Sequence, residues 1–113
     1  MNPIDRFKAM LEAGQDNALL RLTLGNAYLA QGQAADAVLH LRAAVTQDPN
    51  YSAAWKALGK ALEDTQALAD ASDAYARGIA VAQQRGDLQA AREMQVFHKR
   101  VLKKLDQEPP TNA

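Results

Sequence analysis

Apolar side chains recur every three or four residues along almost the whole chain, and short runs of polar residues, glycine or proline interrupt them. This spacing is typical of amphipathic helices. Asn2 followed by Pro3 predicts the start of a helix, and Gly14 predicts its end. The interruptions divide the chain into six predicted helices, which cover about 3–13, 18–31, 34–47, 51–64, 68–85 and 88–105.

The same residue types return 34 positions later in the chain. Leu24-Gly25 matches Leu58-Gly59, and the other matched pairs are Tyr28 with Leu62, Ala37 with Ala71, Leu41 with Tyr75, and Ala44 with Gly78. A period of this length indicates a helical hairpin that is repeated in space. Repeats of this kind build extended binding surfaces, so the sequence predicts a protein that binds rather than one that catalyses a reaction.

Small and large residues at the repeated positions have different roles. Small residues such as Gly25 and Gly59 let two helices approach closely, while large ones such as Tyr28 and Trp55 fill the space between helix pairs. Gly78 lies in the middle of a predicted helix, where glycine costs up to about 1 kcal/mol relative to alanine. This position therefore predicts a close crossing with a neighbouring helix.

These repeated positions resemble the tetratricopeptide repeat family, in particular small bacterial-type members with about two full repeats. The matches cover 18–51 and 52–85. The first repeat departs from the family pattern at Arg21, where the family has tryptophan, and the second departs from it at Leu62, Gln66, Gly78 and Gln83. The resemblance implies an all-α fold, a right-handed α-solenoid of about six helices arranged as antiparallel pairs.

Phe7 and Met10 lie 34 positions before Leu41 and Ala44, so the first helix matches the second half of a preceding repeat. Six helices make three pairs, which is about the minimum for a stable solenoid. Residues 108–113, which include two prolines, are expected to form a disordered tail. We expect one domain over 1–107, with a half-repeat helix at 3–13, repeats at 18–51 and 52–85, and a C-terminal capping helix at 87–106.

Composition argues against several classes of function. Thirteen Lys and Arg balance thirteen Asp and Glu, so no overall charge favours nucleic acid or an anionic membrane. The absence of cysteine removes disulfides, thiolate catalysis and cysteine-based metal sites. The N-terminus lacks the apolar run of a signal peptide, and no stretch approaches the ~18 apolar residues of a membrane span. We therefore expect a cytoplasmic protein.

The resemblance implies that the first helices of the repeats line a concave groove for an extended peptide or a partner helix. Lys56 and Lys60 lie one helical turn apart and, with the amide of Asn26, suit a carboxylate. Alternatively, the two lysines form a solvated face paired with Glu63 and Asp64. The candidate groove residues are Leu19, Leu22, Asn26, Leu29, Lys56, Lys60 and Glu63, with Ala30, Ala53 and Asp64 beside them, and with Phe97 and His98 if the sixth helix leans across the groove.

A carboxylate clamp is known from chaperone-binding members of the family. It would require a lysine at the position of Leu22 and an asparagine at the position of Ala57, so only Asn26 matches. The resemblance therefore does not support binding to the acidic C-termini of heat-shock chaperones. Leu19, Leu22 and Leu29 instead suit a ligand that has both apolar and polar groups.

The sixth predicted helix has an apolar and a basic side. Residues 88–105 hold five basic residues and one acidic residue, a local charge of +4. Such a helix either binds an acidic partner, RNA or a membrane surface, or it caps the last repeat and keeps its basic side in water. Arg92 and Glu93 replace the Leu-Gly pair of the repeats, so the helix must dock in a different register. The apolar side consists of Ala91, Met94, His98, Val101, Leu102 and Leu105, and the basic side of Arg92, Lys99, Arg100 and Lys103.

The sequence contains no nucleophile motif, phosphate-binding glycine loop or metal-ligand spacing. We interpret His40 as a helix-surface residue and His98 as a residue of the cap interface. We therefore expect no catalytic residue, no metal and no cofactor. The predicted function is a non-enzymatic adaptor that binds a protein or peptide partner in its groove, as a monomer or a homodimer.

Two alternatives remain. One is a structural or homo-oligomeric subunit, in which exposed apolar residues of the first helix, Ile4, Phe7 and Leu11, pack against another chain. The other is an accessory protein of nucleic acid or membrane surfaces that uses the basic side of the sixth helix.

Overall fold

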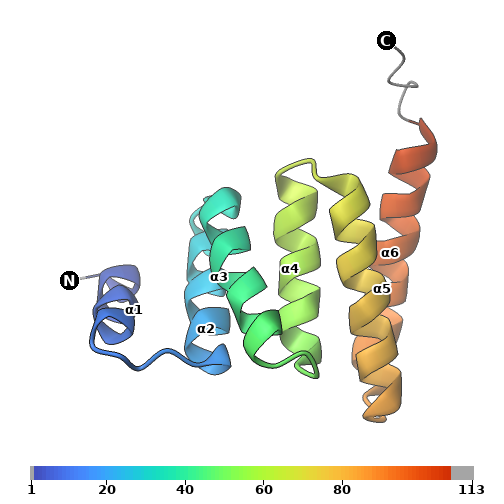
Figure 1. Cartoon of the computed structure of the whole chain (residues 1–113). Helices are drawn as coiled ribbons and strands as arrows, with labels where there is room; N and C mark the ends of the chain where they lie inside the picture. Colours follow the sequence, from blue (N-terminus) through green and yellow to red (C-terminus); the bar gives the residue numbers. More distant parts are fainter. Residues whose placement is uncertain (1, 108–113) are drawn as a thin grey trace.

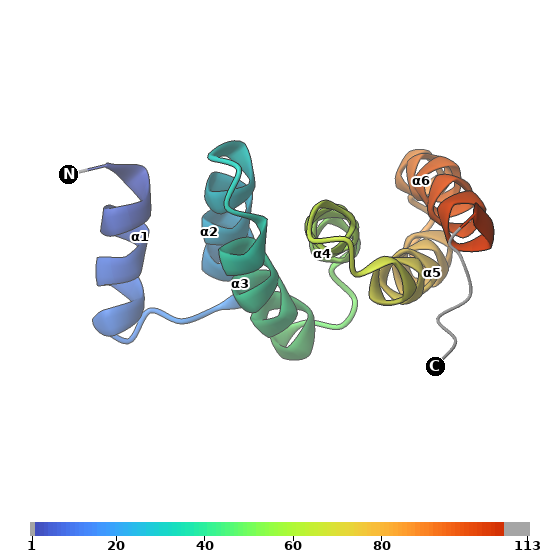
Figure 2. The same ribbon diagram turned by 90° about the horizontal axis from the view of Figure 1, so that it is seen from above.

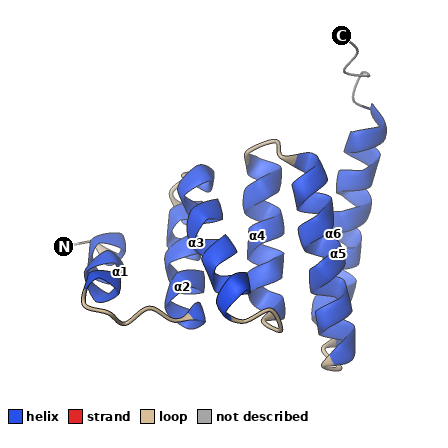
Figure 3. Cartoon of the chain, in the orientation of Figure 1, coloured by secondary structure: helices blue, strands red, loops and turns tan. Residues whose placement is uncertain are grey.

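The computed structural model describes residues 2–107, and within this range the chain forms helices and no strands (Figure 1, Figure 3). Each helix lies within two residues of the range that the apolar pattern predicts. The expected disordered tail, 108–113, lies outside the described residues. The helices are α1 (Pro3–Glu12), α2 (Ala18–Ala30), α3 (Ala34–Gln47), α4 (Ser52–Asp64), α5 (Leu68–Gln84) and α6 (Leu88–Gln107).

Local polar contacts explain where the first two helices begin. The Asn2 side chain accepts a hydrogen bond of 2.9 Å from the backbone N–H of Asp5, and Pro3 occupies the first helical position. Asn17 caps α2 in the same way, accepting a bond of 2.8 Å from the N–H of Leu20. These bonds satisfy backbone donors that have no partner within the helix, so the short polar runs before α1 and α2 set their first residues.

The helices form two layers, as Figure 2 shows: α2, α4 and α6 lie along one side of the molecule, and α3 and α5 along the other. On the first side α2 contacts α4, and α4 contacts α6. On the second side no Cα atoms of α3 and α5 come within 8 Å of each other. The stack is therefore more closely packed along α2, α4 and α6, which form its concave side, and α3 and α5 form its convex side.

Glycines mark the points where helices touch, as the sequence predicts. A Cβ atom added to Gly25 would lie 2.5 Å from Cγ of Leu41, and one added to Gly59 would lie 2.7 Å from Cζ of Tyr75. Both distances are shorter than a carbon–carbon van der Waals contact. At Gly78 a Cβ would lie 2.8 Å from Cβ of Trp55 and would also meet Met94, which confirms the close crossing.

The sixth helix docks with a shifted register. α5 has 17 residues and α3 has 14. As a result α6 begins 36 residues after α4, whereas α4 begins 34 residues after α2. Ala91, Met94 and Val101 are buried against α5. The sequence places Leu102 on the apolar side of this helix. That prediction is wrong, because Leu102 is 46% exposed.

The first helix is covered more completely than the sequence predicts. It packs against α2, and Ile4 is buried with only 7% of its surface exposed. Phe7 and Leu11 are half-buried against the same core. The expectation that these three residues form an exposed apolar surface is therefore wrong, because α1 turns them onto α2.

Candidate peptide-binding groove

The concave side has a depression of about 580 Å³ between α2 and α4. Five of the nine residues that the sequence proposes for the groove line it: Leu22, Asn26, Leu29, Lys56 and Lys60. They converge because α4 repeats α2 at an interval of 34 residues, so equivalent positions of the two helices face the same side. The remaining lining residues are Ala30, Ala53, Ala57 and Asp64.

The depression has an apolar floor and a polar rim. Leu22 and Ala57 are 8% and 7% exposed and form part of the floor, while Asn26, Lys60 and Asp64 are exposed. Leu22 and Ala57 are also the two positions at which a carboxylate clamp would have polar side chains. The groove therefore buries apolar groups where such a clamp would hold a carboxylate.

The two lysines of the groove have different surroundings. Nζ of Lys56 lies 2.7 Å from Oε2 of Glu93 on α6, and this hydrogen bond lowers the pKa of Glu93. The alternative pairing of the lysines with Glu63 and Asp64 is therefore wrong. Lys60 forms no ion pair with any described residue, and its Nζ lies 5.8 Å from the ring centroid of Phe97. Phe97 thus lies beside the groove, next to its exposed cation.

Glu63 does not belong to the groove surface, in contrast to the sequence prediction. Its side chain is 7% exposed and accepts hydrogen bonds of 2.8 Å from Tyr75 and 3.1 Å from Nε of Arg100. Nζ of Lys104 lies 3.4 Å away. Burial raises the pKa of Glu63, but the hydrogen bonds from Arg100 and Tyr75 outweigh it and leave that pKa below its usual value. The carboxylate therefore joins α4, α5 and α6.

Leu19 and His98 also lie away from the depression. Leu19 is 64% exposed, but it does not line the hollow. Nε2 of His98 lies 3.0 Å from Oγ of Ser72, so this ring faces α5 instead of the groove. The interpretation of His98 as a residue of the interface between the last helices agrees with this contact.

His40 is half-buried, so the prediction of a helix-surface residue is correct only in part. Its ring stacks on that of Tyr28, with centroids 5.5 Å apart and planes 4° from parallel. Nη1 of Arg21 lies 3.0 Å from its Nδ1, and Arg21 also binds both carboxylate oxygens of Asp16 at 2.8 Å. Arg21 occupies the position where the second repeat has Trp55. The polar cluster of Asp16, Arg21 and His40 therefore takes the place of an indole. No local sequence pattern indicates this cluster.

Two further findings concern metal ligands and membrane-spanning helices within residues 2–107. Among them no three histidine or acidic side chains are grouped as metal ligands would be. None of the described helices combines the length and the apolar character that crossing a bilayer requires.

Comparisons with known proteins agree with this fold. Residues 18–61 match the tetratricopeptide repeat family model. A TPR repeat-containing protein of Pseudomonas aeruginosa is 50% identical over 103 residues, which cover 91% of this chain and 94% of that protein.

Solved structures show the same similarity. A Bordetella parapertussis protein has 46% identity and a TM-score of 0.78, covering 92% of this chain and 90% of its own. The Sgt2 TPR domain of Aspergillus fumigatus has 29% identity and a TM-score of 0.78, covering 97% of this chain and 74% of its own. The chain therefore belongs to the tetratricopeptide repeat family.

Proposed function

We propose that the chain is a non-enzymatic interaction module that binds an extended peptide or a helix of a partner protein in its concave groove. The observation that carries this proposal is the depression between α2 and α4, with its apolar floor and polar rim. A site of this composition gains affinity by burying an apolar side chain and gains orientation from a few polar groups.

The groove favours a ligand that combines one apolar and one acidic group. The floor at Leu22 and Ala57 accepts the apolar side chain. Glu93 already neutralises Lys56, so Lys60 is the cation available to a ligand carboxylate. Asn26 lies 34 residues before Lys60, at the same position of the preceding repeat, and adds an amide that donates and accepts hydrogen bonds.

This binding mode fits the role of an adaptor. An adaptor needs only to hold its partner, and neither a cofactor nor a metal enters the proposed interaction. We also propose a cytoplasmic location, because a chain without cysteine does not need an oxidising compartment for its fold.

A charge-reversal experiment tests the proposal. Peptides are selected from a displayed library on the intact protein, and the Kd of the best peptide is measured by calorimetry. Lys60→Glu should weaken binding at least tenfold, which corresponds to about 1.4 kcal/mol, because it replaces the attracted cation by a repelling carboxylate. Leu22→Asp should weaken it further by placing a charge on the apolar floor.

Lys103→Glu is the matched control, since it makes the same charge change at an exposed position of α6 that does not line the groove. Its Kd should stay within twofold of the unchanged protein. Selected peptides that bind Lys60→Glu and Leu22→Asp as tightly as the original chain would show that the groove is not the binding site.

The two alternative functions receive less support. The apolar residues of α1 that an assembly subunit would use are covered by α2. On α6, Arg100 and Lys104 bind Glu63, which leaves Arg92, Lys99 and Lys103 as the basic residues of this helix without an ion-pair partner in the described chain. No observation favours either alternative over the groove.

A further inference from the structure

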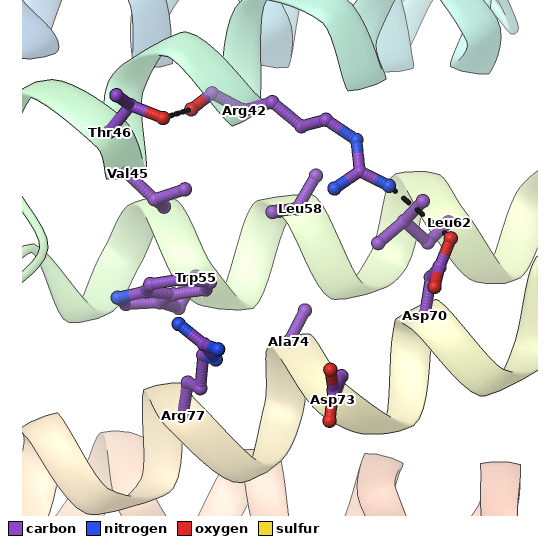
Figure 4. Close-up of a pocket in the computed structure, with 10 residues that line it drawn as sticks. All are labelled: Arg42, Val45, Thr46, Trp55, Leu58, Leu62, Asp70, Asp73, Ala74 and Arg77. Atoms are coloured by element: carbon purple, nitrogen blue, oxygen red, sulfur yellow. Dashed lines mark hydrogen bonds and ion pairs between the residues drawn. The ribbon is translucent and has the colours of Figure 1, made fainter.

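The convex side has a hollow of its own, of about 290 Å³. It lies between α3 and α5, over the face of α4 (Figure 4). Its apolar floor consists of Val45, Leu58, Leu62 and Ala74. Because it lies on the side opposite the peptide groove, a ligand here would not compete with one bound between α2 and α4. We call it the convex pocket.

The preceding repeat places two aromatic rings at the equivalent position. Tyr28 is the eleventh residue of α2 and Leu62 the eleventh of α4, while His40 is the seventh of α3 and Ala74 the seventh of α5. The rings of Tyr28 and His40 stack at 5.5 Å. The second repeat replaces both rings by smaller aliphatic side chains. The convex pocket is therefore hollow where the chain elsewhere packs a flat ring against its neighbour.

The side chains of Trp55 and Arg77 form one end of the pocket. Nε1 of Trp55 donates a hydrogen bond of 2.8 Å to the carbonyl of Pro49, which holds the indole in place. The guanidinium of Arg77 lies 5.7 Å from the indole ring and covers it (Figure 4). The indole is therefore already held in place, so binding beside it requires little ordering of Trp55.

The rim carries charge that the protein does not use. Asp73 lines the pocket and forms no hydrogen bond or ion pair with any residue in the described part of the chain. At the other end, Arg42 and Asp70 form an ion pair of 3.4 Å, with side chains that are 53% and 63% exposed. So exposed a pair is weak and can open at little cost.

We propose that the convex pocket binds an aromatic side chain with a ring N–H, a histidine or tryptophan of a partner protein. The ring takes the place that the His40 ring fills in the first repeat, lies on the apolar floor and donates its N–H to Asp73. The guanidinium groups of Arg42 and Arg77 contact its face. A leucine side chain has no donor and leaves Asp73 without a partner.

The test uses N-acetyl-tryptophanamide and N-acetyl-histidinamide as probes, with N-acetyl-leucinamide as the control compound. Each is titrated into the ¹⁵N-labelled full chain, and amide shifts are followed by NMR. Both aromatic probes should shift the signals of Val45, Ala74 and Arg77 in a saturable way, with the signals of Asn26 and Lys60 unchanged. The leucine compound should bind at least fivefold more weakly.

Two variants separate this site from unspecific binding. Asp73→Ala changes an exposed side chain that has no partner within residues 2–107, and it should weaken the aromatic probes at least fivefold. The double variant Leu62→Tyr with Ala74→His rebuilds the two rings of the first repeat and should abolish probe binding. The proposal is wrong if the pocket signals do not move, if the leucine compound binds equally well, or if Asp73→Ala binds the probes unchanged.

Discussion

Gly32 and Gln66 occupy the same turn in the two repeats, and both have a left-handed backbone. Their φ angles are +73° and +64°. Glycine adopts this conformation without strain, whereas an L side chain crowds the following carbonyl oxygen. The second repeat thus keeps the turn of the first but places an unfavourable residue in it.

Replacing Gln66 by glycine should stabilise the protein by about 0.5–1 kcal/mol. The change removes roughly 1–2 kcal/mol of left-handed strain, partly offset by the greater freedom of glycine in the unfolded chain. Urea unfolding measures the difference. The reciprocal variant, Gly32→Gln, is the control: an added Cβ there meets nothing within 4 Å, so any loss of stability reflects the backbone alone. An unchanged or lower stability of Gln66→Gly would contradict this account.

His40 should make stability depend on pH. Its pKa lies below the usual 6.5 because burial, and then the positive charge of Arg21, disfavour protonation. The folded state therefore binds fewer protons than the unfolded state. The stabilising contribution is complete above pH 6.5 and is lost as the pH falls through the lowered folded-state pKa. Below pH 6.5 the free energy of unfolding of His40→Gln should therefore fall less steeply with decreasing pH than that of the unchanged protein. An identical pH dependence in the two proteins would refute the role of His40.

At the scale of elements, ion pairs join α6 to α4. Lys56 binds Glu93 across α4 and α6, and Glu63 binds Arg100 and Lys104. The apolar side of α6 then packs on α5, where Met94 and Val101 are fully buried. Ion pairs and apolar packing together fix the last helix beside the groove.

Glu63→Ala should destabilise the fold by about 2 kcal/mol, because it leaves the Tyr75 hydroxyl and Arg100 without their acceptor. A fully buried pair would cost more, but Arg100 and Lys104 are about half exposed. Hydrogen exchange should show the loss of protection mainly in α6. Glu93→Ala is the control: its carboxylate is more exposed than that of Glu63, so the loss of stability should be clearly smaller. Equal effects of the two variants would contradict the role of Glu63.

The helices and their pairing could be predicted from the sequence, because apolar spacing and capping residues act locally. The side-chain contacts of the last helix could not. Glu63 and Arg100 are 37 residues apart, and their meeting depends on the longer α5, which shifts α6 by two residues relative to the 34-residue period. The sequence does not indicate the contact between Arg21 and His40, because it depends on the stacking of the ring on Tyr28, which leaves His40 half-buried.

The candidate groove could be predicted in part for the same reason. Leu22 and Asn26 on α2 and Lys60 on α4 occupy positions of the 34-residue repeat that face the same side, so the period predicts that they share a surface. Glu63 lies about one turn beyond Lys60, near the end of α4, and its side chain contacts α5 and α6. A sequence pattern reports the angle of a residue around its helix, but the neighbouring helix decides whether that angle faces water.

At the scale of the molecule, the stack presents two different hollows on opposite sides. The concave groove has an apolar floor with an exposed lysine, and the convex pocket has an apolar floor with an unused aspartate. The chain carries no net charge, so we expect the proposed recognition to depend on these local arrangements rather than on long-range attraction. Two opposite sites would allow one small adaptor to hold two segments at once.

The most direct test of the concave groove is NMR shift mapping with the best peptide from the displayed library. Addition of that peptide should move the amide signals of Asn26, Ala30, Ala53 and Lys60, which line the depression between α2 and α4. Signals from the outer faces of α3 and α5 should stay in place. Shifts confined to α3 and α5, with the groove signals unmoved at saturation, would contradict the proposed function.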